Sequence, residues 1–227
     1  DSVSDKAKII AGTGTYSTSE SIEITKMADS LGVDGIMIVT PYYSKPSQHG
    51  ILRHFEEISK ITDLPIMAYN IPGRTSTLIE LETLQTLVVD IGIHSIKDAV
   101  GDFEFSKKQL ELLKDKADIY SGNDNQTYDF VINGGAGVVS VASHVVGDEI
   151  SEMISFAKDN DLEKAEEINM QLSNLFESIF EEPSPGPIKK ILSESWEEVG
   201  EPLLPITTIT PELANKIRGF YKKIKEN

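Results

Sequence analysis

Short apolar runs rich in β-branched residues alternate along the chain with longer stretches in which apolar positions recur every three or four residues. The short runs are mostly continuous rather than alternating, which is typical of parallel strands covered on both faces. The longer stretches have the periodicity of amphipathic helices. The pattern predicts strands over residues 8–12, 35–40, 65–70, 95–100, 118–122 and 137–142, and helices over residues 18–31, 48–62, 80–89, 103–114, 126–133 and 148–159.

The order strand then helix, repeated six times with short turns and no hairpin signal, predicts an α/β protein with a parallel sheet. A dinucleotide-binding fold would need the pattern G-x-G-x-x-G after a strand. Gly12-Thr13-Gly14 follows the first predicted strand, but the third glycine position is occupied by Ser17. A TIM (β/α)8 barrel fits better, because candidate catalytic residues occur at the C-terminal ends of several strands.

The last part of the chain contains predicted helices and no predicted strand, with helices over residues 162–180, 187–196 and 211–225. We therefore predict two domains, a (β/α) barrel over residues 1–161 and a C-terminal helical domain over residues 162–227. A complete barrel has eight βα units and typically takes about 250 residues. Only six units are predicted, so we expect the first two to be missing from this chain.

The chain is strongly acidic, because 37 Asp and Glu residues against 21 Lys and Arg residues give a formal net charge of −16. Nucleic acids and anionic membranes need a basic surface, so the sequence argues against both as partners. No apolar run reaches about 18 residues, the length that spans a bilayer. The chain has no cysteine for thiol chemistry, and its four histidines lack the spacing of metal ligands. We expect a soluble cytoplasmic protein without a metal.

Lys97 and Tyr69 are the strongest candidates for catalysis. Lys97 lies within a predicted strand, where burial would lower the pKa of its ammonium group and make the amine a nucleophile of the Schiff-base type. Asp98 beside it should point to the opposite face of the sheet. Tyr69 ends the preceding strand, where its phenol could bond the amine and transfer protons. The simpler alternatives are a lysine that reaches solvent and an aromatic plug at the barrel rim.

Two loops at the same rim carry further candidates. Arg74 follows the strand of Tyr69, and its guanidinium suits a substrate carboxylate, although it could equally be a surface arginine. Tyr42 and Tyr43 follow another strand, and such paired aromatics more often serve packing or an interface. These signals gain weight in combination, because Tyr69, Arg74 and Lys97 should lie at the ends of adjacent barrel strands.

Several segments together resemble the dihydrodipicolinate synthase (4-hydroxy-tetrahydrodipicolinate synthase) family. The segments are Ile10-Ala11-Gly12-Thr13-Gly14, Thr40-Pro41-Tyr42-Tyr43-Ser44-Lys45-Pro46-Ser47-Gln48, Tyr69-Asn70-Ile71-Pro72-Gly73-Arg74-Thr75, Ile96-Lys97-Asp98-Ala99, Ser121-Gly122-Asn123-Asp124, Gly137-Val138-Val139-Ser140-Val141 and Pro183-Ser184-Pro185-Gly186-Pro187-Ile188-Lys189. The resemblance implies a lyase of lysine and diaminopimelate biosynthesis. Such an enzyme joins pyruvate to L-aspartate 4-semialdehyde, and it needs no cofactor beyond the pyruvate imine on Lys97.

The resemblance also implies roles for individual residues. Lys97 would attack the ketone of pyruvate, Tyr69 would relay protons, and Arg74 would hold the carboxylate of the semialdehyde. Backbone at Gly122 and Val139 would line the pyruvate end of the site.

Tyr43 would correspond to a tyrosine that reaches into the site of a neighbouring subunit, and the implied assembly is a homotetramer of two tight dimers. An aromatic body with a polar tip suits such a position.

Two alternatives remain open from the sequence. Aldolases of 2-keto-3-deoxy sugar acids or N-acetylneuraminate share the tyrosine and lysine framework, although Arg74 and the Tyr42-Tyr43 pair favour the synthase. The resemblance also implies a Gly-Thr-Thr motif that supports the proton relay, and no such motif occurs in the 227 residues. The chain could therefore be a truncated, inactive structural paralogue.

Overall fold

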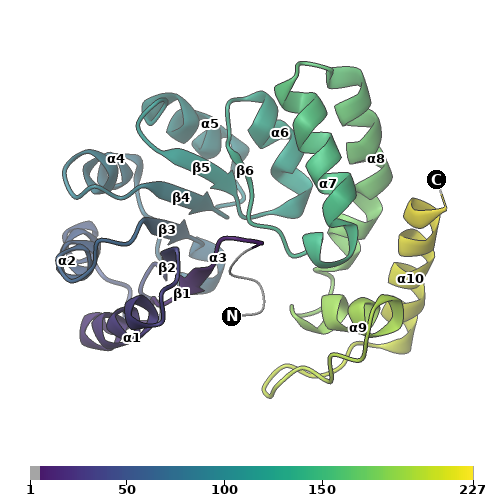
Figure 1. Ribbon diagram of the computed structural model, residues 1–227, viewed down its shortest axis with the longest axis horizontal. Coiled ribbons are helices and arrows are strands. Elements are labelled where there is room, and N and C mark those ends of the chain that lie inside the picture. The colour runs from purple at the N-terminus through teal and green to yellow at the C-terminus, as the bar shows by residue number, and fades with distance from the viewer. Residues whose placement is uncertain (1–5, 227) are drawn as a thin grey trace. The chain divides into compact units, whose positions relative to one another are not determined.

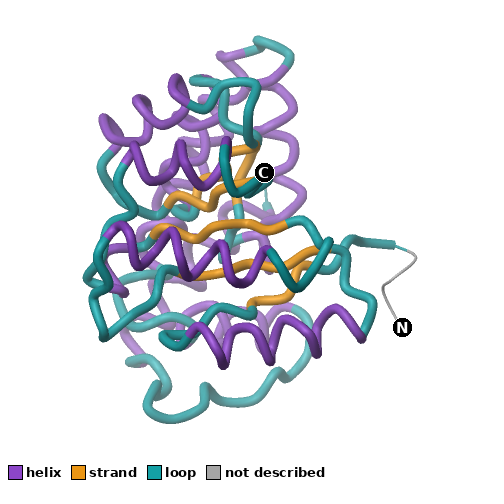
Figure 2. Tube along the Cα trace, turned by 90° about the vertical axis from the view of Figure 1, so that its left-hand side faces the viewer, coloured by secondary structure: helices purple, strands orange, loops and turns teal. Residues whose placement is uncertain are grey.

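Six strands form one sheet in the computed structural model, which describes residues 6–226. The strands follow one another across the sheet in chain order, and the four pairings between β1 and β5 are parallel. They lie side by side across the middle of Figure 2. The strands are β1 (Ile10–Gly12), β2 (Gly35–Val39), β3 (Ile66–Asn70), β4 (Ser95–Asp98), β5 (Asp118–Ser121) and β6 (Gly137–Val138). The predicted parallel sheet of six strands is thus confirmed.

The face of the sheet toward the helices holds a row of buried apolar residues. Ile38, Ala68, Ile96 and Ile119 lie in register on β2 to β5 and are almost completely buried. Side chains alternate between the two faces of a strand, so one residue further along every side chain points the other way. This register sets which residues can meet on the opposite face.

Four helices cover this face of the curved sheet (Figure 1). They are α1 (Thr18–Ser30), α2 (Gln48–Ser59), α4 (Leu81–Val89) and α5 (Phe103–Leu112). Three of them begin where a polar side chain accepts a backbone N–H of the first turn, an arrangement that stabilises helix starts. The capping residues are Ser17 for α1, Ser47 for α2 and Asp102 for α5.

The periodicity missed two single turns, α3 (Pro72–Thr75) and the 3₁₀ turn η1 (Asp124–Gln126), because one turn is too short to show a repeat. It also extended β4 to residue 100. The strand ends at Asp98, whose buried carboxylate accepts the backbone N–H of Val100 at 2.8 Å. A local side-chain bond of this kind competes with the strand ladder.

The described residues divide into two compact units, one of residues 6–122 with 133–137 and one of residues 123–132 with 138–226. The second unit contains η1 and five helices around a core that includes Leu172, Phe176 and Ile217. The predicted domain boundary between residues 161 and 162 stays a prediction. The helices are α6 (Thr127–Ile132), α7 (Ser143–Lys158), α8 (Leu162–Ser178), α9 (Gly186–Ser195) and α10 (Pro211–Lys225).

The prediction placed the start of α7 at residue 148, whereas the helix begins at Ser143. Val146 has non-helical backbone angles, and Gly147 follows it, so the first turns do not show the apolar repeat of a regular helix. Over residues 6–226, no helix is both long and apolar enough to cross a membrane.

His54 on α2 makes the stability of the fold depend on pH. Its ring is 4% exposed, Nδ1 lies 2.9 Å from the Thr18 hydroxyl oxygen, and Nε2 is buried without a hydrogen-bond partner among the described residues. Burial disfavours the imidazolium and lowers the pKa of His54 to about 4. As the pH falls, His54 of the unfolded chain takes up a proton near pH 6.5, whereas His54 of the folded chain does so only near pH 4.

We predict that the free energy of unfolding falls as the pH decreases from 6.5 to about 4, by up to roughly 3 kcal/mol from His54. Denaturant titrations at several pH values measure this slope. His54→Gln should flatten it, whereas His49→Gln, at an exposed position on the same helix, should not. An equal slope in wild type and His54→Gln would refute the assignment.

Candidate active site

A row of four residues crosses the face of the sheet opposite the helices. Val39, Tyr69, Lys97 and Tyr120 lie in register on β2, β3, β4 and β5, and all four are half-buried. Residues in register on neighbouring parallel strands point to the same side. The sheet therefore places the lysine between two tyrosines from the adjacent strands.

Lys97 and Tyr69 are in direct contact. The Lys97 Nζ lies 4.1 Å from the centroid of the Tyr69 ring, within the range of a cation–π interaction. Burial raises the pKa of the Tyr69 phenol, and the positive charge of Arg74 opposes this shift without reversing it. Tyr69 is thus a neutral proton donor near pH 7, next to the amine. The predicted bond between its hydroxyl and the amine stays a prediction.

Asp98 occupies the opposite face, as predicted. Its side chain is 1% exposed and accepts a hydrogen bond from the Ser106 hydroxyl on α5 at 2.9 Å. The carboxylate therefore anchors the end of β4 to the helix layer and leaves Lys97 on the other side.

Gly122 adjoins Lys97 at the end of β5. Its N–H donates to the Asp98 carbonyl at 2.6 Å, so the backbones of β4 and β5 remain close here. A β-carbon at this position would lie 2.7 Å from the Ala99 Cβ and 3.2 Å from the Lys97 Cε. Only glycine fits this spacing without displacing Ala99 and crowding the lysine.

One cavity of about 410 Å³ joins two predicted site residues, Tyr69 and Arg74. Arg74 belongs to α3 and is exposed at its edge. The cavity is lined by Gly12, Gly14, Met37, Val39, Tyr42, Tyr69, Ile71, Arg74 and Thr75. It combines one positive charge with two phenols, which suits a small anion that also carries a reactive carbonyl.

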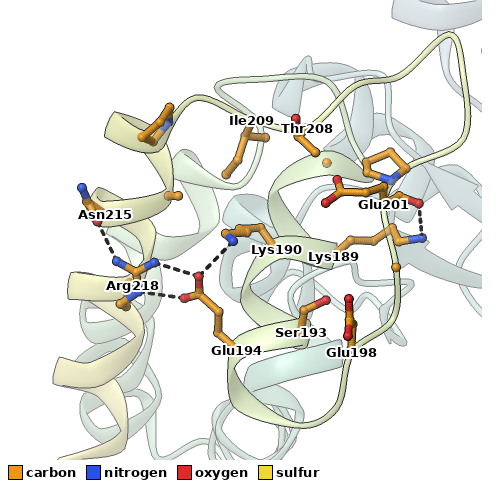
Figure 3. A pocket seen from close by; sticks show the side chains of 15 residues that line it. Lys189, Lys190, Ser193, Glu194, Glu198, Glu201, Thr208, Ile209, Asn215 and Arg218 are labelled. Atoms are coloured by element: carbon orange, nitrogen blue, oxygen red, sulfur yellow. Dashed lines mark hydrogen bonds and ion pairs between the residues drawn. The ribbon is translucent and has the colours of Figure 1, made fainter.

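A second cavity, of about 620 Å³, lies within the helical unit among α9, α10 and the connection between them. Figure 3 shows that its Lys190 and Arg218 both point to Glu194, with nitrogen–oxygen distances of 3.3 Å and 2.7 Å. Lys189 donates to the Glu201 carbonyl oxygen at 2.9 Å. Three lysine or arginine side chains face three glutamates in this cavity, so it has no net charge to attract an anion.

Comparison with known proteins shows the family of the chain. The family model of the dihydrodipicolinate synthetase family matches residues 1–224. The chain belongs to this family. A 4-hydroxy-tetrahydrodipicolinate synthase of Desulforudis audaxviator is 41% identical over 98% of this chain and 76% of its own length. One of Microcystis aeruginosa is 45% identical over 98% of this chain and 75% of its own length.

Solved structures of dihydrodipicolinate synthases share the fold. The enzyme from Thermotoga maritima has a TM-score of 0.95 and 32% identity, covering 98% of this chain and 77% of its own. A second enzyme, from Bacillus anthracis, has a TM-score of 0.92 and 40% identity, covering 97% and 76% of the two chains. The predicted family and its TIM-barrel fold with C-terminal helices are confirmed. This chain spans about three quarters of the length of these relatives.

The structure separates the two tyrosines that precede α2. Tyr42 lines the cavity and packs edge-on against Tyr16, with ring centroids 5.7 Å apart. Tyr43 has a positive φ of 68° and is 91% exposed. Its predicted role in a neighbouring subunit stays a prediction.

Val139, predicted at the pyruvate end, follows β6 in the second unit and is half-buried there. Its predicted role also stays a prediction. The sequence reasoning missed Tyr120 in the row, and it named Tyr42 only as one of a pair of aromatics at the rim. Tyr120 could have been found from the sequence, because it lies on the predicted strand two residues before Gly122, and alternate residues of a strand share one face. In the structure it lies in register with Lys97.

Gly122→Ala tests the close approach at the lysine. We predict that the variant folds but loses most of its ability to form an imine with pyruvate, because the new methyl group forces Ala99 aside at the end of β4 and crowds the Lys97 side chain. Borohydride trapping with pyruvate measures imine formation, and circular dichroism reports folding. Gly219→Ala on α10, where a β-carbon meets nothing within 4 Å, is the matched control. If Gly122→Ala is trapped with pyruvate as readily as wild type, the close approach at Gly122 does not determine the position of Lys97.

Proposed function

We propose that this chain condenses pyruvate with L-aspartate 4-semialdehyde through an imine on Lys97, the reaction of 4-hydroxy-tetrahydrodipicolinate synthases. One observation carries the proposal: Lys97 lies on the open face of the sheet, against the Tyr69 ring and beside a position that only glycine fits. A lysine amine with a proton donor at its side has the parts that Schiff-base chemistry requires. The relatives named above carry this enzyme name at about 40% identity.

The proposed chemistry uses three groups of the chain. The neutral Lys97 amine attacks the ketone carbon of pyruvate, Tyr69 donates a proton to the departing oxygen, and water leaves as the imine forms. Loss of a proton from the pyruvate methyl group gives an enamine, whose carbon attacks the aldehyde. The substrate's own amine then closes the ring and displaces Lys97, so no external cofactor is needed. Arg74 holds the semialdehyde carboxylate.

The negative charge of the chain increases the need for a positive side chain such as Arg74 where anionic substrates bind. Both substrates are anions, and the chain has a formal net charge of −16, so binding needs a local excess of positive charge. Arg74 on the cavity wall is the side chain that supports this role. A site for a polyhydroxylated sugar tail has no such need of a second cation.

Three further proposals rest on the family resemblance and not on geometry. We place Val139 at the pyruvate end together with Gly122. We place Tyr43 in the site of a neighbouring copy, for which its 91% exposure leaves it accessible, within a homotetramer. We also propose the cytoplasm as the location.

Lys97→Arg tests the proposed function directly. We expect wild type to consume pyruvate and aspartate semialdehyde together, and the variant to lose turnover by at least about a thousandfold, because guanidinium stays protonated and cannot form the imine. A coupled assay of product formation measures this. Wild-type protein that folds but shows no turnover would identify an inactive paralogue instead.

Arg74→Ala tests the assignment of the second substrate. Loss of a charge-assisted pair with a carboxylate should raise the KM for aspartate semialdehyde by about 10- to 100-fold. Trapping of pyruvate on Lys97 should change little, because Arg74 lies on α3 rather than on the strand of the lysine. Equal losses in both half-reactions would show that Arg74 has a different role.

A further inference from the structure

The loop that carries Arg74 joins β3 to α4 through residues 71–80. It leaves β3, forms the single turn α3 and returns to start α4. Among the described residues, the Arg74 guanidinium has no hydrogen bond or ion pair that would fix its direction. Its position therefore depends on how firmly the loop itself is held.

Asn70 holds the returning end of this loop. Its side chain is completely buried, Nδ2 donates to the Ile79 carbonyl at 3.0 Å, and Oδ1 accepts the Ile79 N–H at 3.0 Å. A side-chain amide paired in this way with both backbone groups of one residue takes the place of a neighbouring strand. This pair of hydrogen bonds is a clamp on the loop, and because Asn70 directly follows Tyr69, one end of the clamp lies next to the site.

Gln48 makes a second clamp of the same kind from the first residue of α2. Its Nε2 donates to the Leu78 carbonyl at 2.8 Å, and its Oε1 accepts the Glu80 N–H at 3.2 Å. The two amides thus hold three consecutive residues of the loop from two different elements. Gln48 also follows the loop that contains Tyr42, so its bonds connect that loop to the loop of Arg74.

Inside the loop, Thr75 completes the support. It is 2% exposed, and its hydroxyl lies 3.0 Å from the carbonyl oxygens of both Ile71 and Thr77. The outward-facing Arg74 is therefore the neighbour of a buried, hydrogen-bonded residue. The loop is fastened at its centre and at its return, while the Arg74 side chain is exposed.

We propose that Gln48 and Asn70 are positioning residues that set Arg74 for the carboxylate of the aldehyde substrate. The proposal rests on the proposed function and deepens it. Neither residue needs to touch the substrate. Their amides determine where the guanidinium stands relative to Tyr69, so they govern recognition of the second substrate and not imine formation on Lys97.

Gln48→Ala is the principal test, because Gln48 is only half-buried and its loss leaves the core intact. We expect the KM for aspartate semialdehyde to rise by about tenfold, as two hydrogen bonds are lost. The rate of pyruvate trapping on Lys97 should stay within about twofold of wild type. Gln48→Glu retains the acceptor for the Glu80 N–H and should give an intermediate KM. Gln85→Ala, at an exposed position on α4, is the matched control.

Hydrogen exchange separates failure of this inference from failure of the proposed function. Amides of residues 71–80 should exchange faster in Gln48→Ala than in Gln85→Ala, while those of α5 should not change. If wild type is active, an unchanged KM for aspartate semialdehyde or an equal loss of trapping overturns the inference. If wild type is inactive, the proposed function fails, and unchanged exchange over residues 71–80 overturns the clamp as well.

Discussion

The site depends on the register between β3, β4 and β5. Parallel pairing sets Tyr69 opposite Lys97 and Lys97 opposite Tyr120, so three polar-ended side chains share one face. A shift by one residue would turn every one of them toward the buried helix layer. The apolar row that includes Ile96 prevents this shift, because those side chains would lose their burial. The core on one face thus fixes the chemistry on the other.

Gly122 allows the close approach of the two strands where β5 ends beside β4. Its N–H bond to Asp98 and the space that its missing side chain leaves keep Ala99 and Lys97 close to it. Asp98 in turn is held by Ser106 on α5. The position of Lys97 is therefore determined by a neighbouring strand and a helix together, and its contact with Tyr69 follows from this geometry.

Much of this arrangement was predictable from the sequence because it depends on local patterns. All six strands, and the assignment of Lys97 and Asp98 to opposite faces, follow from apolar periodicity and alternation. The clamps formed by Gln48 and Asn70 were not predictable, because the partners of a polar side chain depend on which distant loop passes by. The same holds for Tyr42, because nothing in a pair of adjacent tyrosines shows which of them lines the cavity and which is exposed.

Reduction of the protein with borohydride in the presence of pyruvate, followed by peptide mapping with mass spectrometry, tests whether Lys97 is the nucleophile. We expect one reduced pyruvyl group, located on the peptide that contains Lys97. A folded protein that acquires no such group, or acquires it on another lysine, would show that Lys97 is not the nucleophile.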